Sequence, residues 1–159
     1  MLAGMGTSDV LRAASGWLDL GLADEALVEL DAIPFERQAD REVLELKLGA
    51  EMSQQAWNPA SDTARLLCLK DADEPMFFIW AAFCLHETGD TLAACNWLLR
   101  GPKSLFEMAI FHYNLACYLN TLGEVKRARS HLKQAITMDE SFREAAREDR
   151  DLIGIGPLA

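Results

Sequence analysis

Alanine recurs at an interval of 34 residues along this chain, and this period constrains the fold more than any other feature of the sequence. The four alanines are Ala26, Ala60, Ala94 and Ala128. A fixed period of this length is typical of an array in which one helical hairpin is copied and stacked. We therefore expect an all-α protein in which each unit of the period contributes two helices.

Other columns repeat with the same period when the units begin at Thr7, Arg41, Pro75 and Ala109. Position 15 of the unit is glycine in three cases and Gln55 in the second. A glycine there predicts a left-handed residue that ends the first helix of the hairpin. Small residues at positions 8 and 20 let two helix backbones approach closely. The columns therefore predict where the helices of each hairpin end and where they cross.

The columns resemble those of the tetratricopeptide repeat, which has Leu-Gly at positions 7 and 8, alanine at 20 and phenylalanine at 24. The last unit matches this pattern most fully, with Tyr113, Ala116, Gly123, Ala128 and Leu132. The second departs from it most, with Lys47 at position 7 and Gln55 at position 15. The resemblance implies a single domain, residues 1–159, folded as a right-handed superhelical array of four helical hairpins. The repeats would span 7–40, 41–74, 75–108 and 109–142, followed by a capping helix and tail at 143–159.

Local signals add detail to this array. Asn58 before Pro59, and Asp90, are expected to cap the second helices of their hairpins. Ser104 and Glu107 have the spacing of a capping box that opens the next helix. The final helix is expected over about 140–152. Its residues Phe142, Ala146 and Ile153 would cover the apolar edge of the last repeat.

Composition narrows the possible partners and the compartment. The formal charge is −10, and residues 1–75 hold 15 acidic and 6 basic side chains. Nucleic-acid binding depends on lysines and arginines that neutralise phosphates, so we expect no nucleic acid as a partner. A basic cluster at 126–133 and 143–150 is interleaved with glutamates, which favours a solvated outer face. The absence of a long apolar run, and of a signal-like start, leads us to expect a cytoplasmic protein without stable membrane insertion.

The sequence offers no recognisable catalytic or metal motif. The four cysteines lie at scattered spacings inside helical patterns, which is typical of small buried side chains in a reducing compartment. The three histidines show no spacing that joins them to cysteines or carboxylates as metal ligands or as a nucleophile and its base. We therefore expect a protein that is not an enzyme and that has no cofactor or metal.

In the tetratricopeptide fold the first helices of the hairpins line a concave groove with their positions 2, 5, 9, 12 and 13. By this resemblance the groove would be acidic at its start and apolar further on, and a protein or peptide partner would bind there through an apolar or helical segment. The candidate groove residues are Glu42, Glu45, Met76, Ile79, Phe83, His86, Ile110, Tyr113, Asn114, Cys117 and Asn120. Met76, Ile79 and Phe83 could equally contact neighbouring helices.

Three functions remain open. The resemblance first implies a non-catalytic adaptor or scaffold that docks a partner and could form a homodimer. A second is a chaperone similar to the class II chaperones of type III secretion, which shield apolar segments of their partners. A third is an adaptor of the bacterial kinesin-light-chain-like kind, associated with tubulin-like filaments. The family members that clamp chaperone C-termini use groove lysines, and only Asn114 matches that set here, so such a clamp is not expected. The apolar tail, 152–159, is a candidate to fold back over the final hairpin or to enter a second molecule.

Overall fold

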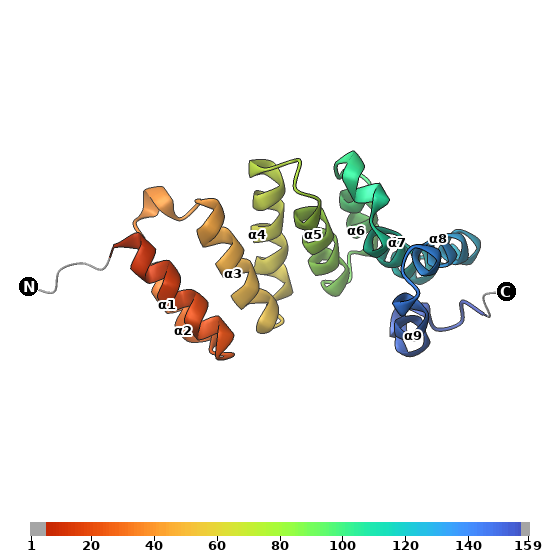
Figure 1. Ribbon diagram of the computed structural model, residues 1–159, viewed down its shortest axis with the longest axis horizontal. Helices are drawn as coiled ribbons and strands as arrows, with labels where there is room; N and C mark the ends of the chain where they lie inside the picture. Colours follow the sequence, from red (N-terminus) through yellow and green to blue (C-terminus); the bar gives the residue numbers. More distant parts are fainter. Residues whose placement is uncertain (1–5, 157–159) are drawn as a thin grey trace, which may run out of the picture. The chain divides into compact units, whose positions relative to one another are not determined.

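The structure is a computed structural model that describes residues 6–156. Over this range the chain forms α-helices and short 3-10 helices, and no residue lies in a strand. Contacts divide the chain into two compact units, Met1–Asp71 and Ala72–Ala159, which are described separately. Each unit contains two helical hairpins (Figure 1). The predicted all-α class and its hairpins are thus confirmed, whereas the single-domain boundary stays a prediction.

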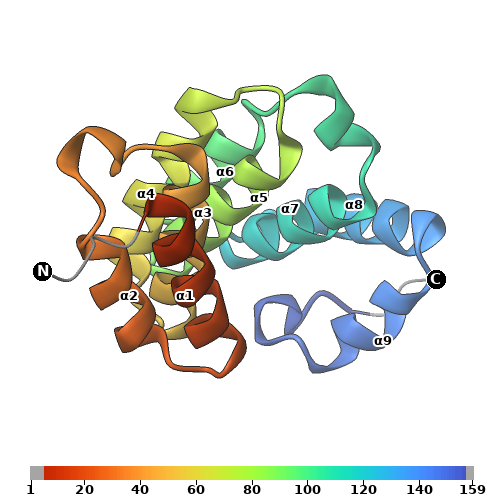
Figure 2. The same cartoon turned by 60° about the vertical axis from the view of Figure 1, so that its left-hand side comes forward.

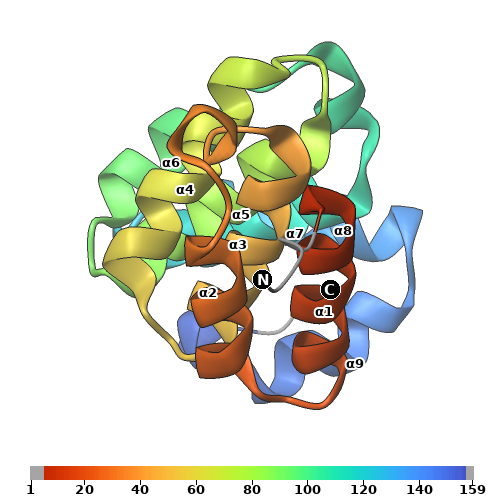
Figure 3. The same cartoon turned by 90° about the vertical axis from the view of Figure 1, so that its left-hand side faces the viewer.

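The first unit consists of two hairpins joined by a short 3-10 turn. Figure 3 shows α1 beside both α2 and α3. Val10, Ala14 and Leu30 form part of its buried core. Its elements are α1 Thr7–Asp19, α2 Ala23–Asp31, η1 Phe35–Arg37, α3 Arg41–Ser53 and α4 Trp57–Lys70.

The second unit repeats this arrangement and continues into a C-terminal segment. Helices α7 and α8 form its most extensively packed hairpin, and η3 packs on α7. Its elements are α5 Pro75–Glu87, α6 Thr91–Leu98, η2 Lys103–Glu107, α7 Ala109–Thr121, α8 Val125–Met138, α9 Ser141–Glu148 and η3 Arg150–Leu152.

The helices follow the register that the repeat columns predicted. All four first helices begin at position 1 and have 13 residues. All four second helices begin at position 17, at Ala23, Trp57, Thr91 and Val125. The alanines at position 20 are each 0% exposed, because the two helices of a hairpin approach closely there.

The turn between the two helices of each hairpin is the same in all four repeats. Gly21, Gly89 and Gly123 have φ of 75°, 90° and 82°, and Gln55 adopts the same left-handed region with φ 56°. In each repeat the N–H of position 16 donates to the carbonyl of position 11, as from Glu124 to Leu119 at 2.8 Å. These bonds form the Schellman motif that satisfies the last carbonyls of a helix. The second repeat keeps the turn although it lacks the glycine.

Two of the predicted helix starts are wrong. Helix α4 begins at Trp57 after Ala56, so Asn58 lies inside the helix instead of capping it. Ser104 and Glu107 belong to η2, and α7 begins after Met108 without a side-chain cap. Asp90, by contrast, accepts a hydrogen bond from the Ala93 N–H at 3.0 Å, which confirms it as a cap.

Gly101 lies in close contact with the turn η2. A Cβ at Gly101 would lie 2.3 Å from Leu105 Cδ2 and 3.3 Å from Phe78 Cγ, so a larger residue there would require the Leu105 side chain to shift. Leu105 is itself fully buried. The chain folds a 3-10 turn over Gly101, and Leu105 occupies the space that a side chain at that position would need.

The C-terminal segment also differs from the prediction. Helix α9 ends at Glu148, since Asp149 has extended backbone with ψ 118°, and η3 follows it. Ile153 is 78% exposed, so it does not cover the apolar edge; Leu152 and Ile155 are the buried residues instead. The end of the predicted tail, including Leu158, lies outside the described residues.

Candidate peptide-binding site

The surface that receives the C-terminal segment consists of five residues on two first helices, which we call the α5–α7 face. They are His86 and Glu87 at the end of α5, and Tyr113, Cys117 and Asn120 on α7. The three α7 residues share one face because they are four and three residues apart. Figure 2 shows the segment after α9 folded back beside α7. The face thus holds residues 149–153 of the same chain.

Asp149 is bound through its carboxylate by two donors from α7. The Tyr113 hydroxyl donates to Asp149 Oδ2 at 2.7 Å, and the Cys117 thiol lies 3.7 Å from the same oxygen. Burial, followed by the hydrogen bond to Asp149, raises the pKa of Tyr113. Burial, followed by the negative charges of Asp149 and Asp151, raises the pKa of Cys117. Both groups therefore keep their protons at neutral pH and act as donors.

Asp151 is bound by a histidine whose ring is held from both sides. His86 Nε2 lies 3.0 Å from Asp151 Oδ2, and Nδ1 lies 2.9 Å from the Thr91 hydroxyl oxygen. A carboxylate only accepts, so Nε2 carries the proton, and in the neutral ring Nδ1 accepts from Thr91. The ring also packs on Tyr118, with centroids 4.8 Å apart. These contacts fix the imidazole in the orientation that meets Asp151.

The backbone of the segment is bound as well as its side chains. The Asn120 amide donates to the carbonyls of Asp151, at 2.9 Å, and Ile153, at 3.1 Å. Arg150, between the two aspartates, pairs with Glu87 at 2.7 Å. A side-chain amide that donates to the carbonyls of residues i and i+2 recognises main chain whatever the side chains are, as in other modes of peptide binding.

Apolar contacts accompany these hydrogen bonds. The Phe142 ring of α9 stacks on Tyr113, with centroids 4.6 Å apart and an interplanar angle of 26°. Leu152 is 3% and Ile155 is 9% exposed. The segment is therefore docked by a combination of donors, an aromatic stack and buried aliphatic side chains.

Comparison with solved structures identifies the architecture. The crystal structure of MamA protein matches with a TM-score of 0.80 and 16% identity over 92% of this chain and 78% of that chain. A thermophilic TPR protein of Thermus thermophilus, TTC0263, matches with a TM-score of 0.67 and 20% identity over 89% of this chain and 80% of that one. No protein-family profile matches the sequence, and neither does any curated protein.

This chain has the tetratricopeptide repeat fold. The resemblance seen in the repeat columns is therefore confirmed at the level of the fold. The five residues of the α5–α7 face occupy positions 12 and 13 of the third repeat and 5, 9 and 12 of the fourth, which are positions that the family resemblance assigned to the groove.

The structure brings four of the predicted site residues together: His86, Tyr113, Cys117 and Asn120 all contact residues 149–153. The hydrogen bonds to Asp149, to Asp151 and to the carbonyls of the segment described above come from these four residues. Of the other candidates on these helices, Ile79 is buried, and the remaining four are half-buried: Met76, Phe83, Ile110 and Asn114. In the first unit, Glu42 is exposed and Glu45 pairs with Arg41 at 2.7 Å.

Sequence reasoning missed the aspartates of the bound segment. The sequence predicts one continuous final helix through Asp149 and Asp151, and it does not single out Thr91, which holds His86. The available signal was an Asp-Arg-Asp run directly before an apolar, glycine-containing tail. Alternating charges of that kind could have indicated a segment that leaves the helix.

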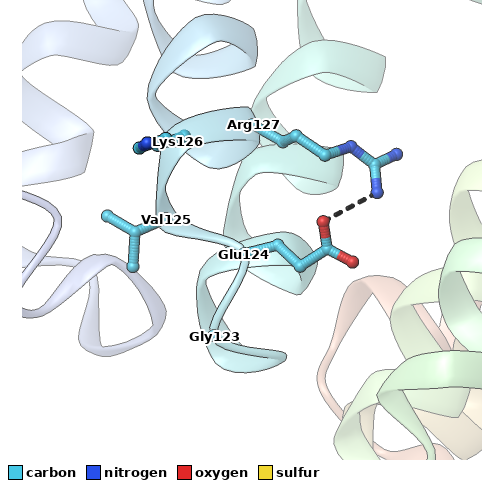
Figure 4. Close-up of a pocket in the computed structure, with 5 residues that line it drawn as sticks. All are labelled: Gly123, Glu124, Val125, Lys126 and Arg127. Carbon is cyan, nitrogen blue, oxygen red and sulfur yellow. Dashed lines mark hydrogen bonds and ion pairs between the residues drawn. The ribbon is translucent and has the colours of Figure 1, made fainter.

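Other surface features involve α8 and α9. A pocket at the start of α8 is lined by residues 123–127, and the Arg127 guanidinium pairs with Glu124 there at 2.9 Å (Figure 4). Arg143 and Arg147 pair in the same way with Glu140 and Glu144. The basic cluster is thus interleaved with carboxylates in space as it is in the sequence.

Two histidines form a second polar contact within the tetratricopeptide fold. His112 Nε2 donates to the Phe106 carbonyl at 3.1 Å, and its Nδ1 lies 3.0 Å from Nδ1 of His131. Burial lowers the pKa of both rings. In the neutral pair His131 therefore donates to His112, which ties η2 and α8 to α7. Among residues 6–156, no group of three or more potential ligands is placed to hold a metal ion.

No helix in the described part of the chain combines the length and apolar character that crossing a membrane requires. All four cysteines are buried.

Proposed function

We propose that this protein is a non-catalytic interaction scaffold that docks a segment of a partner protein on the α5–α7 face. The observation that carries the proposal is that this face already binds a peptide, namely residues 149–153 of the same chain. The tetratricopeptide fold and the groove positions of the five residues support the same function.

The chemistry of the face supports binding rather than catalysis. Cys117 is the one sulfur nucleophile among the five residues, and its pKa is raised by burial and by the nearby carboxylates. A catalytic cysteine needs the opposite shift, because the thiolate is the nucleophile. His86 is engaged by Asp151 and Thr91 and does not contact the thiol through any hydrogen bond that we observe among the described residues.

The alternatives fit the face less closely. A chaperone for purely apolar segments would present apolar contacts, whereas here the bound segment meets a hydroxyl, a thiol, an imidazole and an amide. An adaptor for tubulin-like filaments would be one case of the scaffold, with the filament protein as the partner. A homodimer would arise if residues 149–153 of one copy occupied the face of another. We retain the cytoplasm as the expected compartment.

Affinity capture with matched variants tests the proposal. The bait is the full chain with Asp149→Ala and Asp151→Ala, which frees the face. One derivative also carries Tyr113→Phe and Asn120→Ala, and a control derivative carries Asn96→Ala at an exposed position of α6. We expect at least one protein that the bait and the control retain and that the face derivative retains about tenfold less, as loss of interface anchors predicts. Identical captured sets for all three forms would contradict the proposal.

A further inference from the structure

In the hydrogen bonds between the α5–α7 face and the C-terminal segment, almost all donors belong to the face and almost all acceptors belong to the segment. Four residues of the face, Tyr113, Cys117, His86 and Asn120, provide donors. The segment provides the acceptors, which are two carboxylates and two backbone carbonyls. If a segment without acceptors binds to this face, the donors of the face lose their hydrogen-bond partners. The resulting cost in binding free energy makes the face specific for segments that provide acceptors.

The positions of the acceptors define a pattern. The carboxylates belong to residues i and i+2, Asp149 and Asp151, and the buried leucine follows at i+3, Leu152. Asp149 Oδ1 also accepts the Asp151 N–H at 2.9 Å, which closes a turn and sets the spacing of the two carboxylates. The residue between them, Arg150, is a cation opposite Glu87, but its side chain is 70% exposed, so this pair contributes little.

We propose that residues 149–152 are an intramolecular stand-in for the partner, and that the α5–α7 face selects partner segments with an aspartate, any residue, an aspartate and a leucine in a turn. This inference rests on the proposed scaffold function and adds the chemistry of the ligand. The face recognises an internal segment of a chain and not a chain terminus, since the groups that it binds are side-chain carboxylates and main-chain carbonyls.

The tethered segment must then compete with the partner. Linked to α8 through α9, residues 149–153 are present at the face at an effective concentration of the order of millimolar. A partner with the same pattern binds only when it displaces the tethered segment, either through higher affinity for the face or through contacts outside the five residues. The C-terminal segment therefore sets a threshold for binding.

A labelled peptide with the sequence of residues 148–156, acetylated and amidated at its ends, tests the inference by fluorescence anisotropy. The receptor is the full chain with Asp149→Ala and Asp151→Ala. We expect this receptor to bind the peptide at least about tenfold more tightly than the unaltered chain does, because the competitor is weakened. A matched peptide with asparagine in place of both aspartates should bind at least about tenfold more weakly.

Equal affinity for the two peptides, or equal affinity of the two receptors, would overturn the inference. If the alanine receptor does not fold by circular dichroism, the isosteric chain with Asp149→Asn and Asp151→Asn takes its place. A dimer of the unaltered chain in light scattering, lost in the variant receptor, would assign the segment to a second copy and would also overturn the intramolecular stand-in.

The two proposals fail separately. If the peptides are not distinguished but capture still depends on Tyr113 and Asn120, the scaffold function stands and the ligand pattern is wrong. If capture does not depend on the face, the scaffold function itself is wrong, whatever the peptides do.

Discussion

At the scale of single residues, Gln55 shows how a repeat tolerates a departure from its pattern. It adopts φ of 56° in a turn that glycine occupies in the other three repeats. A residue with a Cβ has a steric cost in this region, and the surrounding Schellman bonds hold it there. We predict that Gln55→Gly stabilises the protein by about 0.5–1 kcal/mol, measured by urea unfolding. The matched change Gly123→Ala should destabilise it, and a loss of stability in Gln55→Gly would contradict this explanation of the turn.

Glu51 is a buried carboxyl whose ionisation opposes folding. It is 4% exposed, and Oε2 finds no hydrogen-bond partner within the described range. Burial raises its pKa, against the lowering effects of a hydrogen bond with Thr63 and the charge of Lys47. Because the folded-state pKa lies above the unfolded one, the stability associated with the protonated carboxyl is present at low pH. It is lost as pH rises through the folded-state pKa.

We therefore predict that Glu51→Gln stabilises the protein at pH 7 by about 1 kcal/mol, because the uncharged amide avoids the cost of burying a charge whose Oε2 has no hydrogen-bond partner among the described residues. The gain should shrink below about pH 4, where the native carboxyl is also neutral. Urea unfolding at the two pH values measures it. A gain that is the same at both, or a loss at pH 7, would show that the charge of Glu51 does not matter.

At the scale of elements, the crossings of the helices depend on the alanine column. Ala94 is 0% exposed on α6. Ala94→Glu would place a charge without a partner in a helix crossing, and we predict a loss of roughly 3–5 kcal/mol in the free energy of unfolding. Thermal unfolding followed by circular dichroism measures it, with Asn96→Glu at an exposed position of the same helix as the control. An unchanged melting temperature would mean that Ala94 does not lie at a crossing.

The elements that the sequence could predict are those with local causes. The first and last residues of the repeat helices follow from the periodic small residues and from the turn at position 15. The second repeat keeps this turn although Gln55 replaces the glycine. Helix α9 ends for a reason that is not local: Asp149 leaves the helix and binds Tyr113, which is 36 residues away in the sequence. No pattern within one repeat reveals such contacts.

The candidate site was predicted in part for the same reason. Groove positions carried over from the repeat pattern include His86, Tyr113, Cys117 and Asn120, because the helix register fixes their face. Their contacts with Asp149 and Asp151 require knowing that the chain turns back. Tyr113 also contributes to packing, because it is 8% exposed and its ring stacks on Phe142.

A conservative substitution separates the two contributions of Tyr113. Tyr113→Phe keeps the ring that stacks on Phe142 and removes the donor to Asp149. We predict a loss of about 1–2 kcal/mol in the local stability of the docked segment, seen as faster amide hydrogen exchange at 152–155. The amides of α8 should be unaffected. Uniformly faster exchange would instead show that the hydroxyl supports the whole unit.

At the scale of the whole molecule, the C-terminal segment connects fold to function, because it occupies the binding face of the same chain. A truncation that removes the bound segment should begin at Asp149, since both aspartates belong to that segment. A deletion that begins after Asp151 would leave their contacts in place.

The most direct measurement is solution NMR of the full chain. We predict nuclear Overhauser contacts between the Asn120 side-chain amide and residues 151–153, since that amide lies 2.9 Å from the Asp151 carbonyl. The Asp149→Ala, Asp151→Ala chain should lose them. The contradicting result is that these contacts are absent from the unaltered chain and that the amides of 152–155 exchange at the rates of an unstructured peptide. In that case the face does not hold the C-terminal segment.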